Sequence, residues 1–357
     1  MSSNANGQNK KKYTDAKPFL KWAGGKSNLL TQLDDYLPTQ LKERKIKRYI
    51  EPFVGGGALF LHIARYYPVQ EYVIADINPE LYIGYQVIKY DVPQLCERLE
   101  ELEWRYKRRD EEGRKEMFYQ IRELYNSQRE LVHELEYGPA WVERAAQLIF
   151  LNHTCFNGLF RVNSKGFFNV PFGKYKNPRI WNPRNLKDLS MVLQDTLILH
   201  SDFEDIEGFA DENSFVYFDP PYRPISKTSS FAAYARGSFN DEDQRRLAQF
   251  AHRLHNRGVS WMLSNSDPKN ENPDDHFFEE IFGHFTIDRV SASRKINSNA
   301  KKRGRIREIL VNNQARLDAD TLVQLPIQHN NSKPHLSLVS DNQSPAQTAI
   351  ANAASAS

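Results

Sequence analysis

The chain has 357 residues, 40% of them hydrophobic and 26% charged, a balance typical of a globular protein with one large or two ordinary domains. Its net charge is only +3, so bulk charge does not by itself indicate a nucleic-acid partner. The two cysteines, Cys96 and Cys155, provide neither a disulfide framework nor a zinc-ligand spacing, which fits a reducing cytoplasm. No apolar stretch approaches about 18 residues, and the N-terminus lacks the apolar segment of a signal peptide, so we expect neither a membrane span nor a cleaved leader.

Predicted strands and helices alternate along most of the chain. Ser27 is predicted to cap a helix with leucines on one face, followed by strand at 46–50, helix at 58–67, strand at 72–77 and helix at 80–89. Further strands are predicted at 197–200, 215–218, 259–263, 285–290 and 306–311, with a helix at 241–256 that Gly258 ends. This alternation predicts an α/β fold with a doubly wound, mainly parallel sheet that helices cover on both faces.

Residues 93–184 depart from this pattern. They begin with a charged stretch of helical period, and Asn, Gly, Arg, Lys and aromatic residues without a clear period follow. We interpret 93–184 as an inserted domain, so that 17–92 and 185–315 form the main domain. Residues 1–16 are expected to be a flexible N-terminus, and residues 317–357, rich in Asn, Gln, Ser, Ala and Pro, a disordered tail.

A turn of unusual composition, Asp219-Pro220-Pro221-Tyr222, ends the apolar run at 215–218. Open α/β sheets bind ligands at the carboxyl ends of their strands, where this turn is expected to lie. Each proline lacks a backbone donor, so the turn offers two acceptors, the Asp219 carboxylate and the Pro220 carbonyl, beside a flat ring. This composition suits a planar base that presents an NH2 group, although a strand-ending turn with a capping Asp has the same letters.

A second motif, Glu51-Pro52-Phe53-Val54-Gly55-Gly56-Gly57, follows a predicted strand and opens a helix, with Asp76 at the end of the next strand. Glycines let a ligand approach the backbone, and a carboxylate at that place typically binds ribose hydroxyls, so the pair indicates a nucleoside-containing cofactor. The dinucleotide fingerprint fails because Phe60 stands at its third small position, and the phosphate-binding loop fails because Leu20 stands where its first glycine is required. S-adenosylmethionine, which carries no phosphate, is the remaining interpretation.

Together these segments resemble the Dam-type adenine-specific DNA methyltransferases over about residues 17–312. Matching stretches occur in the family's order, at 19–26, 51–60, 75–79, 157–176 and 219–224. The resemblance implies a Rossmann-like S-adenosylmethionine methyltransferase fold with an inserted, mainly helical DNA-recognition domain that carries a β-hairpin. It further implies a cytoplasmic enzyme that transfers a methyl group, without a metal, to the N6 amino group of an adenine flipped out of the duplex.

The same resemblance assigns roles to individual residues. The expected catalytic residues are Asp219, Pro220 and Tyr222, with the Tyr222 ring stacked on the target base. Residues expected to contact the cofactor are Trp22, Lys26, Phe53, Gly55, Gly57, Asp76, Asp202, Phe203 and Asp219.

The segment from Asn157 to Tyr175 is predicted to be a β-hairpin that, in the family, enters the major groove of double-stranded DNA. Arg161 is the candidate for guanine readout, because Arg is the usual bidentate partner of guanine O6 and N7. These positions match the subset of the family that methylates adenine in 5′-GATC-3′, with departures at 154–156 and 162. A basic cluster at 294–307 is a further candidate for phosphate contacts, or else a solvated edge. The other expected DNA contacts are Lys21, Phe156, Leu159, Pro171, Lys174 and Tyr175.

Two alternatives to this function stay open. Related enzymes with the D/N-P-P-Y motif methylate RNA or glutamine side chains, which also present a planar NH2 group, whereas the predicted hairpin favours duplex DNA. A DNA-binding protein without activity could keep the same fold, but the intact Asp219, Asp76 and Lys26 argue against it. A separately acting restriction endonuclease is a candidate partner, and the sequence leaves open whether the role lies in restriction–modification.

Overall fold

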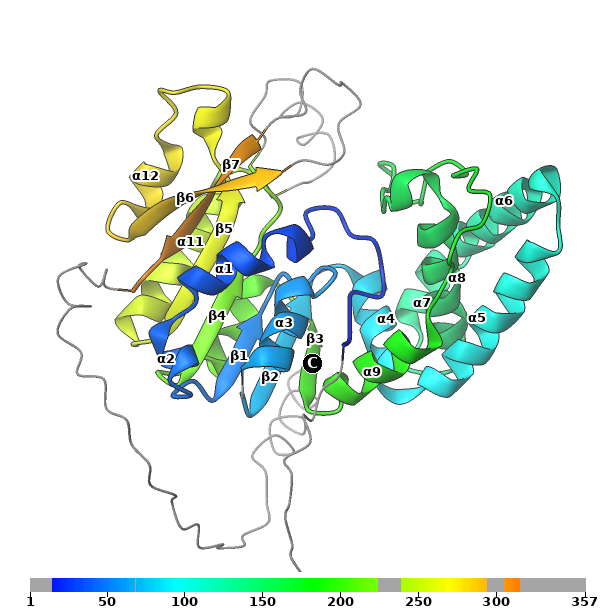
Figure 1. The fold of residues 1–357 in the computed structure, drawn as a ribbon, viewed down its shortest axis with the longest axis horizontal. Helices are drawn as coiled ribbons and strands as arrows, with labels where there is room; N and C mark the ends of the chain where they lie inside the picture. Colours follow the sequence, from blue (N-terminus) through cyan, green and yellow to red (C-terminus); the bar gives the residue numbers. More distant parts are fainter. Residues whose placement is uncertain (1–14, 68, 224–238, 294–304, 315–357) are drawn as a thin grey trace, which may run out of the picture. The chain divides into compact units, whose positions relative to one another are not determined.

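A single sheet forms the centre of the computed structural model, which describes residues 15–67, 69–223, 239–293 and 305–314 (Figure 1). Within these residues the sheet has seven strands in the order β3-β2-β1-β4-β5-β7-β6. The predicted α/β class and mainly parallel sheet are confirmed, because β1 to β5 run parallel while β7 pairs antiparallel with both β5 and β6. The strands are β1 (Arg48–Glu51), β2 (Glu71–Asp76), β3 (Thr196–His200), β4 (Ser214–Phe218), β5 (Ser260–Ser266), β6 (Thr286–Ser293) and β7 (Arg305–Asn312).

Helices cover both faces of the sheet because successive strand residues point to opposite sides. In β4, Tyr217 belongs to the apolar cluster on the face of α3, whereas Val216 and Phe218 belong to the cluster on the face of α11, where Phe218 contacts Phe250. The helices of these layers are η1 (Lys26–Asn28), α1 (Leu30–Tyr36), α2 (Thr39–Lys42), α3 (Ala58–Tyr66), α4 (Pro79–Tyr90), α9 (Pro183–Leu193), η3 (Phe203–Phe209), α11 (Asp241–Asn256), η4 (Pro268–Asn270) and α12 (Phe277–Phe282).

Two of the predicted boundaries that differ from the structure bear on the site. Ser27 does not cap a helix: residues 26–28 form a 3-10 turn in which the Leu29 N–H donates to the Lys26 carbonyl at 2.7 Å, and α1 begins only at Leu30. Strand β5 does not end at residue 263 but continues through Ser266, because β7 pairs with it as far as Ser266. By contrast, Gly258 does end α11 as predicted, with a left-handed φ of 76°.

The stretch between α4 and α9 is largely helical, as its period predicts. It contains α5 (Val92–Lys107), α6 (Glu111–Ser127), α7 (Arg129–Glu134), α8 (Pro139–Thr154) and η2 (Phe156–Gly158), which Figure 1 shows gathered beside α4 and α9. Helix α8 is the centre of this group, since most of its side chains are buried and it packs against α4, α5 and α6. Its apolar core is continuous with the core on the α3 face of the sheet.

A buried ion pair also joins α4 to α8. Arg144 Nη2 lies 2.5 Å from Glu80 Oε1, and His133 Nε2 lies 3.0 Å from the same oxygen. Burial raises the pKa of the Glu80 carboxyl, but hydrogen bonds from His133 and Arg144 outweigh it and lower the pKa to about 2. None of the described helices is long and apolar enough to cross a membrane.

Candidate active site

The two sequence motifs meet where the order of the strands reverses. The chain proceeds from β1 outward to β2 and β3, then returns to β4 on the other side of β1, and β1 pairs with both β2 and β4. The glycine loop follows β1 and the Asp219–Tyr222 turn follows β4, so both lie at the carboxyl edge of two adjacent parallel strands. Ligands of open α/β sheets bind at such a reversal point.

The glycine loop is held in place by its own backbone and by Asp76. The Gly57 N–H donates to the Val54 carbonyl at 2.7 Å, and the Val54 N–H donates to the Ala75 carbonyl of β2 at 3.0 Å. Gly57 has a φ of 71°, and a Cβ atom there would lie 2.7 Å from the Tyr85 hydroxyl oxygen. That position therefore requires glycine for both its conformation and its space.

Asp76 accepts two backbone hydrogen bonds at the end of β2. Gly55 N–H donates to Oδ2 at 3.0 Å and Asn78 N–H donates to Oδ1 at 2.9 Å. Burial nevertheless raises the pKa of the Asp76 carboxyl to about 6, because these two bonds only partly offset the loss of hydration. Asp76 is thus a sheltered acceptor beside the glycine loop.

Trp22 lies against the glycine loop on one side and against Phe160 of the predicted hairpin on the other. A Cβ atom on Gly55 would approach Trp22 Cδ1 to 2.9 Å, so the indole lies almost on the Gly55 backbone. The indole stacks on Phe160 with ring centroids 5.1 Å apart. Trp22 therefore connects the predicted cofactor residues with the predicted DNA-binding segment.

Asp219 is held by two side chains that come from distant parts of the chain. Lys26 Nζ lies 2.6 Å from Oδ1 and 2.8 Å from Oδ2, and it also donates to the Gly24 carbonyl at 2.9 Å. The Lys26 side chain is only 4% exposed, so this is a sheltered ion pair rather than a surface one. Ser264 Oγ, at the extended end of β5, donates to Asp219 Oδ1 at 3.0 Å.

The hydroxyls behind Asp219 form a chain into the core. Tyr217 Oη lies 2.8 Å from Ser264 Oγ. Serine has one hydroxyl hydrogen and an ionised carboxylate only accepts, so Tyr217 must donate to Ser264 while Ser264 donates to Asp219. Among the described residues, Asp219 Oδ1 accepts from both Lys26 and Ser264, whereas Oδ2 accepts from Lys26 alone.

A buried acid lies close to this pair. Glu51, the last residue of β1, accepts a hydrogen bond from the Tyr49 hydroxyl at 2.6 Å. Burial raises the pKa of the Glu51 carboxyl to about 8, and the negative charge of Asp219 adds to the effect. Glu51 is therefore protonated at neutral pH, which avoids two carboxylates competing for Lys26.

The Tyr222 ring faces both Lys26 and β7. Lys26 Nζ lies 4.6 Å from the ring centroid, and the Tyr222 hydroxyl donates to Glu308 Oε2 at 2.6 Å. Burial raises the pKa of Tyr222 well above its usual range, and the charges of Asp219 and Glu308 raise it further. The ring is consequently fixed at its hydroxyl end by Glu308, beside the predicted catalytic residue Asp219.

Asp202 and Phe203 lie at the start of η3, and their contacts are largely internal. Asp202 Oδ1 accepts from the Glu204 N–H at 3.1 Å as a helix cap, and Arg246 Nη2 donates to Oδ2 at 2.7 Å. Phe203 is buried and stacks on Phe53 at 5.4 Å between centroids. The structure thus brings the two predicted aromatic contacts, Phe53 and Phe203, together, while the Asp202 carboxylate already has protein partners.

The predicted hairpin is present as a short, irregular one. Val162 and Phe168 form an isolated antiparallel bridge, and the Asn169 N–H donates to the Arg161 carbonyl at 3.1 Å. The side chain of Asn126 in α6 holds it from behind, because it accepts from the Phe168 N–H at 2.8 Å and donates to the Phe168 carbonyl at 3.0 Å. Arg161 is exposed, and its Nε donates to Asn169 Oδ1 at 2.7 Å, which sets the direction of its guanidinium.

The other predicted DNA-contacting residues lie on the surface near this hairpin. Lys21 Nζ lies 5.2 Å from the centroid of the Tyr175 ring. Buried Asn152 in α8 fixes the Lys21 backbone, accepting from its N–H at 2.8 Å and donating to its carbonyl at 3.0 Å. The same amide donates to the Gly158 carbonyl at 3.0 Å, so one side chain ties Lys21 to the segment after α8. The remaining exposed members are Phe156, Leu159, Pro171 and Lys174.

Comparison with known proteins assigns a family to this geometry. The family described as D12 class N6 adenine-specific DNA methyltransferase matches residues 22–296, which is more than half of the chain. The chain belongs to this family. The predicted resemblance to adenine-specific DNA methyltransferases is therefore confirmed: the protein is an enzyme that methylates adenine in DNA, and the family implies S-adenosylmethionine as methyl donor.

Individual relatives support the same assignment over most of the chain. The Type II methyltransferase M.MjaIII of Methanocaldococcus jannaschii is 48% identical over 300 residues, covering 84% of this chain and 99% of the relative. The Type II methyltransferase M1.LlaDCHI of Lactococcus lactis subsp. cremoris is 37% identical over 299 residues, covering 83% and 95%. The DNA adenine methylase of Escherichia coli K12 is 33% identical over 292 residues, covering 82% and 93%.

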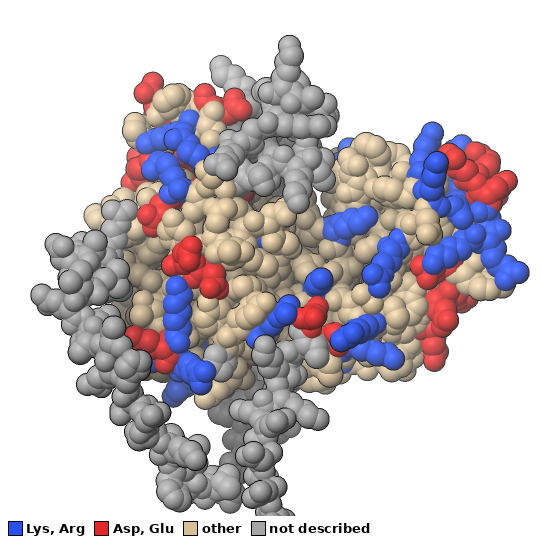
Figure 2. Space-filling model, viewed as in Figure 1, with Lys and Arg blue, Asp and Glu red and all other residues tan. Residues whose placement is uncertain are grey.

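Charge on the surface of this D12-class methyltransferase is mixed. Figure 2 shows Lys and Arg interspersed with Asp and Glu on the face drawn, in agreement with the small net charge. Residues 294–304 of the predicted basic cluster lie outside the described residues. Arg307, which is described, has Nε 3.3 Å from Asp267 Oδ2. Within the described ranges, no group of three or more His, Cys, Asp and Glu is arranged to hold a metal ion.

Sequence reasoning missed two features of this methyltransferase site. It placed Lys26 beside the cofactor but did not foresee its ion pair with Asp219, 193 positions away. It also missed Ser264, because the predicted strand ended one residue earlier. The polar run Ser264-Asn265-Ser266 at the end of an apolar strand was the available signal, since polar residues at that edge of the sheet face the ligand site.

Proposed function

We propose that this D12-class enzyme transfers a methyl group from S-adenosylmethionine to the N6 amino group of a flipped-out adenine in 5′-GATC-3′ duplex DNA. The observation that supports it best is the position of Asp219. It follows β4 directly beside the glycine loop, and Lys26 and Ser264 hold its carboxylate. Methyl donor and amino acceptor can then meet at one edge of the sheet.

The residues around the glycine loop suit S-adenosylmethionine. Asp76 offers a sheltered carboxylate for ribose hydroxyls. It lies beside a glycine loop against whose backbone the Trp22 and Tyr85 side chains already pack, at Gly55 and Gly57 respectively. Trp22, Lys26 and Asp219 would lie toward the methionine moiety, with Phe53, Asp202 and Phe203 toward the adenine. The cofactor supplies an electrophilic methyl group on a sulfonium, so the proposed transfer needs no metal.

The proposed chemistry at the catalytic turn follows from its acceptors. The lone pair of an adenine amino nitrogen is delocalised into the ring, which makes the nitrogen a poor nucleophile. Asp219 Oδ2 and the Pro220 carbonyl would accept its two N–H groups, direct the lone pair, and favour the positive charge that develops on nitrogen. Tyr222 would stack on the extruded base, using the face of its ring that Lys26 does not cover.

Lys26 has a specific part in this proposal. Its ammonium group donates to both carboxylate oxygens of Asp219 and so holds that carboxylate in place in the absence of substrate. The N6 nitrogen gains positive charge as it is methylated, and it then sheds one of its two protons, for which Asp219 is the nearest acceptor in the proposed arrangement. The product is a neutral secondary amine, and no covalent bond to the enzyme forms.

Recognition of the DNA is proposed to rest on the hairpin. Arg161, whose guanidinium Asn169 orients, would contact guanine O6 and N7, and Leu159 and Pro171 would meet thymine methyl groups. Exposed Phe156 would enter the stack that the adenine has left, while Lys21, Lys174 and Tyr175 would contact the backbone. On this proposal 93–184 acts as the target-recognition domain and 17–92 with 185–315 as the catalytic domain. Of the predicted flexible N-terminus 1–16, residues 1–14 lie outside the described residues, as does the whole predicted tail 317–357.

The cellular role that we propose is modification of intracellular DNA alongside a separate restriction endonuclease. Two relatives bear the name Type II methyltransferase, which supports this role, whereas others bear the name DNA adenine methylase. This role requires that host DNA be protected from a GATC-cleaving endonuclease when the gene is expressed in a strain without adenine methylation, and cleavage of that DNA would refute it.

Single-molecule sequencing tests the specificity directly. Duplex DNA treated with purified enzyme and S-adenosylmethionine should carry N6-methyladenine at GATC and little elsewhere. The Arg161→Ala variant should lose discrimination at the contacted guanine by about 1–3 kcal/mol, and Lys165→Ala, an exposed cation at the hairpin tip, serves as the matched control. Methylation centred on a different sequence would refute GATC, and activity on RNA or protein without activity on DNA would refute the substrate class.

A further inference from the structure

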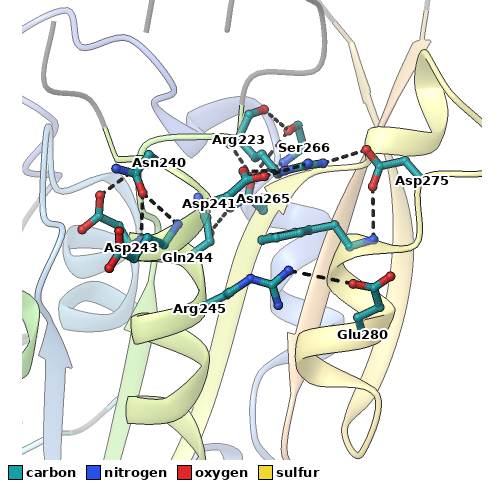
Figure 3. A network of polar contacts seen from close by, with 12 residues as sticks. Arg223, Asn240, Asp241, Asp243, Gln244, Arg245, Asn265, Ser266, Asp275 and Glu280 are labelled. Carbon is teal, nitrogen blue, oxygen red and sulfur yellow. Dashed lines mark hydrogen bonds and ion pairs between the residues drawn. The ribbon is translucent and has the colours of Figure 1, made fainter. Parts of the chain in front are cut away.

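The exit of the catalytic turn is anchored by side chains that no motif names. Pro220 and Pro221 have no N–H, so between Phe218, which pairs with Leu263 of β5, and Arg223 the turn has few donors of its own. Its position must therefore be set by groups that reach it from other elements. Three buried side chains do this at its far end, and Figure 3 shows them converging on Arg223.

Each of these side chains binds a backbone atom of the turn. Asn265 Oδ1 accepts from the Arg223 N–H at 3.1 Å, and Ser266 Oγ donates to the Arg223 carbonyl at 3.1 Å. Gln244 Nε2 of α11 donates to the Pro221 carbonyl at 3.2 Å, and its own oxygen accepts from Asn265 Nδ2 at 3.3 Å. Gln244 and Asn265 are fully buried and Ser266 is 5% exposed, so water offers these groups little competition.

The Arg223 side chain completes the anchor. Its Nε and Nη2 donate to the two carboxylate oxygens of Asp241 at 2.7 and 3.0 Å, and its Nη1 donates to Asp275 Oδ2 at 2.7 Å. The guanidinium carbon lies 4.2 Å from the centroid of the Phe277 ring, and the side chain is 17% exposed. A bidentate pair, a second carboxylate and an aromatic face together hold a guanidinium in one orientation.

The carboxylate partner is itself fixed in place. Asp241 is the first residue of α11, and Asn240 caps that helix by accepting from the N–H groups of Glu242 and Asp243 at 2.7 and 3.1 Å. The Asn240 N–H in turn donates to Asp243 Oδ2 at 3.0 Å, which closes a capping box (Figure 3). Arg223 is thus tied to the rigid start of a helix rather than to a flexible loop.

We propose that Arg223 is a positioning residue for methyl transfer, acting through the Asp219–Tyr222 turn. The two prolines fix their own φ angles, so the turn is a stiff link between β4 and Arg223, and a shift at Arg223 passes to the Pro220 carbonyl and Asp219 instead of being absorbed. This inference rests on the proposed role of that turn. It assigns to Arg223, Asp241 and Asp275 the task of aiming the two acceptors at the amino group.

Single-turnover kinetics with saturating DNA and cofactor test this assignment. Arg223→Ala should lower the methyl-transfer rate about 10- to 100-fold, because displacing a reacting group by about 1 Å can cost about 100-fold in rate. The Kd values for DNA and S-adenosylmethionine should change by less than about threefold, because Arg223 is proposed to act through the turn and not on either ligand. Arg223→Lys keeps the charge but lacks the planar fork that binds both oxygens of Asp241, so its rate should fall between those of alanine and wild type.

The matched control is Arg245→Ala. Arg245 lies over the same Phe277 ring, at 5.0 Å, and pairs with Glu280 at 4.0 Å, and among the described residues these contacts do not involve the turn (Figure 3). The methyl-transfer rate of Arg245→Ala should stay within about twofold of the wild-type rate, because an exposed ion pair contributes little.

Three results would overturn the inference. An Arg223→Ala rate equal to that of the Arg245 control would do so, as would a fall in rate matched by an equal fall in the fraction of active sites measured by burst amplitude. If Arg223→Ala does not fold, the test passes to Arg223→Lys and Asp275→Asn. The third overturning result is a wild-type methyl-transfer rate in both of these variants when their melting temperatures are unchanged. Asp219→Ala, measured in parallel, separates the two claims: full activity there refutes the proposed function, whereas an inactive Asp219→Ala beside a fully active Arg223→Ala refutes only this inference.

Discussion

Replacing Ser264 by alanine removes a hydroxyl that connects Asp219 to the protein core. Ser264 Oγ donates to Asp219 Oδ1 at 3.0 Å and accepts from the Tyr217 hydroxyl at 2.8 Å. The alanine variant therefore loses a hydrogen bond to a charged group. It also leaves the Tyr217 hydroxyl, on a side chain with 0% exposure, without its partner.

The two losses have separate magnitudes. A hydrogen bond to a charged group contributes about 1.5–3 kcal/mol, and an unpaired buried hydroxyl costs about 1–3 kcal/mol of unfolding free energy. If the Ser264 bond aims Asp219 at the amino group, its loss appears in the activation barrier. At about 1.4 kcal/mol per factor of ten, the methyl-transfer rate should fall about 10- to 100-fold.

A double-mutant cycle with Tyr217→Phe distinguishes the two effects. The phenylalanine removes the unpaired hydroxyl, so Tyr217→Phe/Ser264→Ala should recover most of the stability lost in Ser264→Ala but none of the rate. The assays are urea unfolding and single-turnover transfer of a labelled methyl group to a GATC duplex with enzyme in excess. A wild-type rate in Ser264→Ala, or recovery of rate and stability together in the double variant, would refute the reasoning.

Three further predictions concern the cofactor side of the site. Because the pKa of Asp76 is about 6, S-adenosylmethionine affinity measured by calorimetry should fall as pH decreases below about 6; a flat profile between pH 5 and 7 would contradict this. The pKa of Glu51 in the folded protein, about 8, is above its ordinary value of 4.5, so its contribution to stability is full below pH 4.5 and is lost as pH rises through 8. The unfolding free energy of wild type relative to Glu51→Gln should therefore fall over this window by up to about 1.4 kcal/mol per pH unit, and parallel pH profiles would refute it. Gly57→Ala should lower the unfolding free energy of the protein by about 1–2 kcal/mol or more, because of the φ of 71° and the collision with Tyr85. Gly208→Ala, where a Cβ meets no atom within 4 Å, should have no such effect. Equal melting temperatures for the two variants would argue against the collision.

The strand pattern and the two motifs predicted the core of the site because the carboxyl ends of parallel strands share one edge of a sheet. Asp76 and the glycine loop follow β2 and β1, and Asp219 follows β4, so the apolar runs alone brought them together. Contacts between distant segments could not be predicted this way. Nothing in the amino-acid sequence around Lys26 distinguishes a lysine that faces a cofactor from one that binds Asp219 at 2.6 Å.

The end of β5 shows a different limit. Apolar residues indicate a strand through Leu263, but Ser264, Asn265 and Ser266 continue it because β7, more than forty residues later, supplies their pairing partners. Likewise, the letters indicated a hairpin after α8 but not that Asn126 of α6 would hold it through the Phe168 backbone. Side-chain bonds to a distant backbone leave no periodic signal.

The extra length of β5 makes the active site depend on sheet register. β4 stops at Phe218 opposite Leu263, and the next three residues of β5 run on beside the catalytic turn, the first binding Asp219 and the other two binding Arg223. Because the register places Ser264 beside Asp219, a slip of one residue between β4 and β5 would put either Asn265 or Leu263 where Asp219 now meets a hydroxyl. An insertion or deletion in the short connection between α11 and β5, far from any reacting atom, would thus alter the chemistry at the acceptor rather than only the packing of the core.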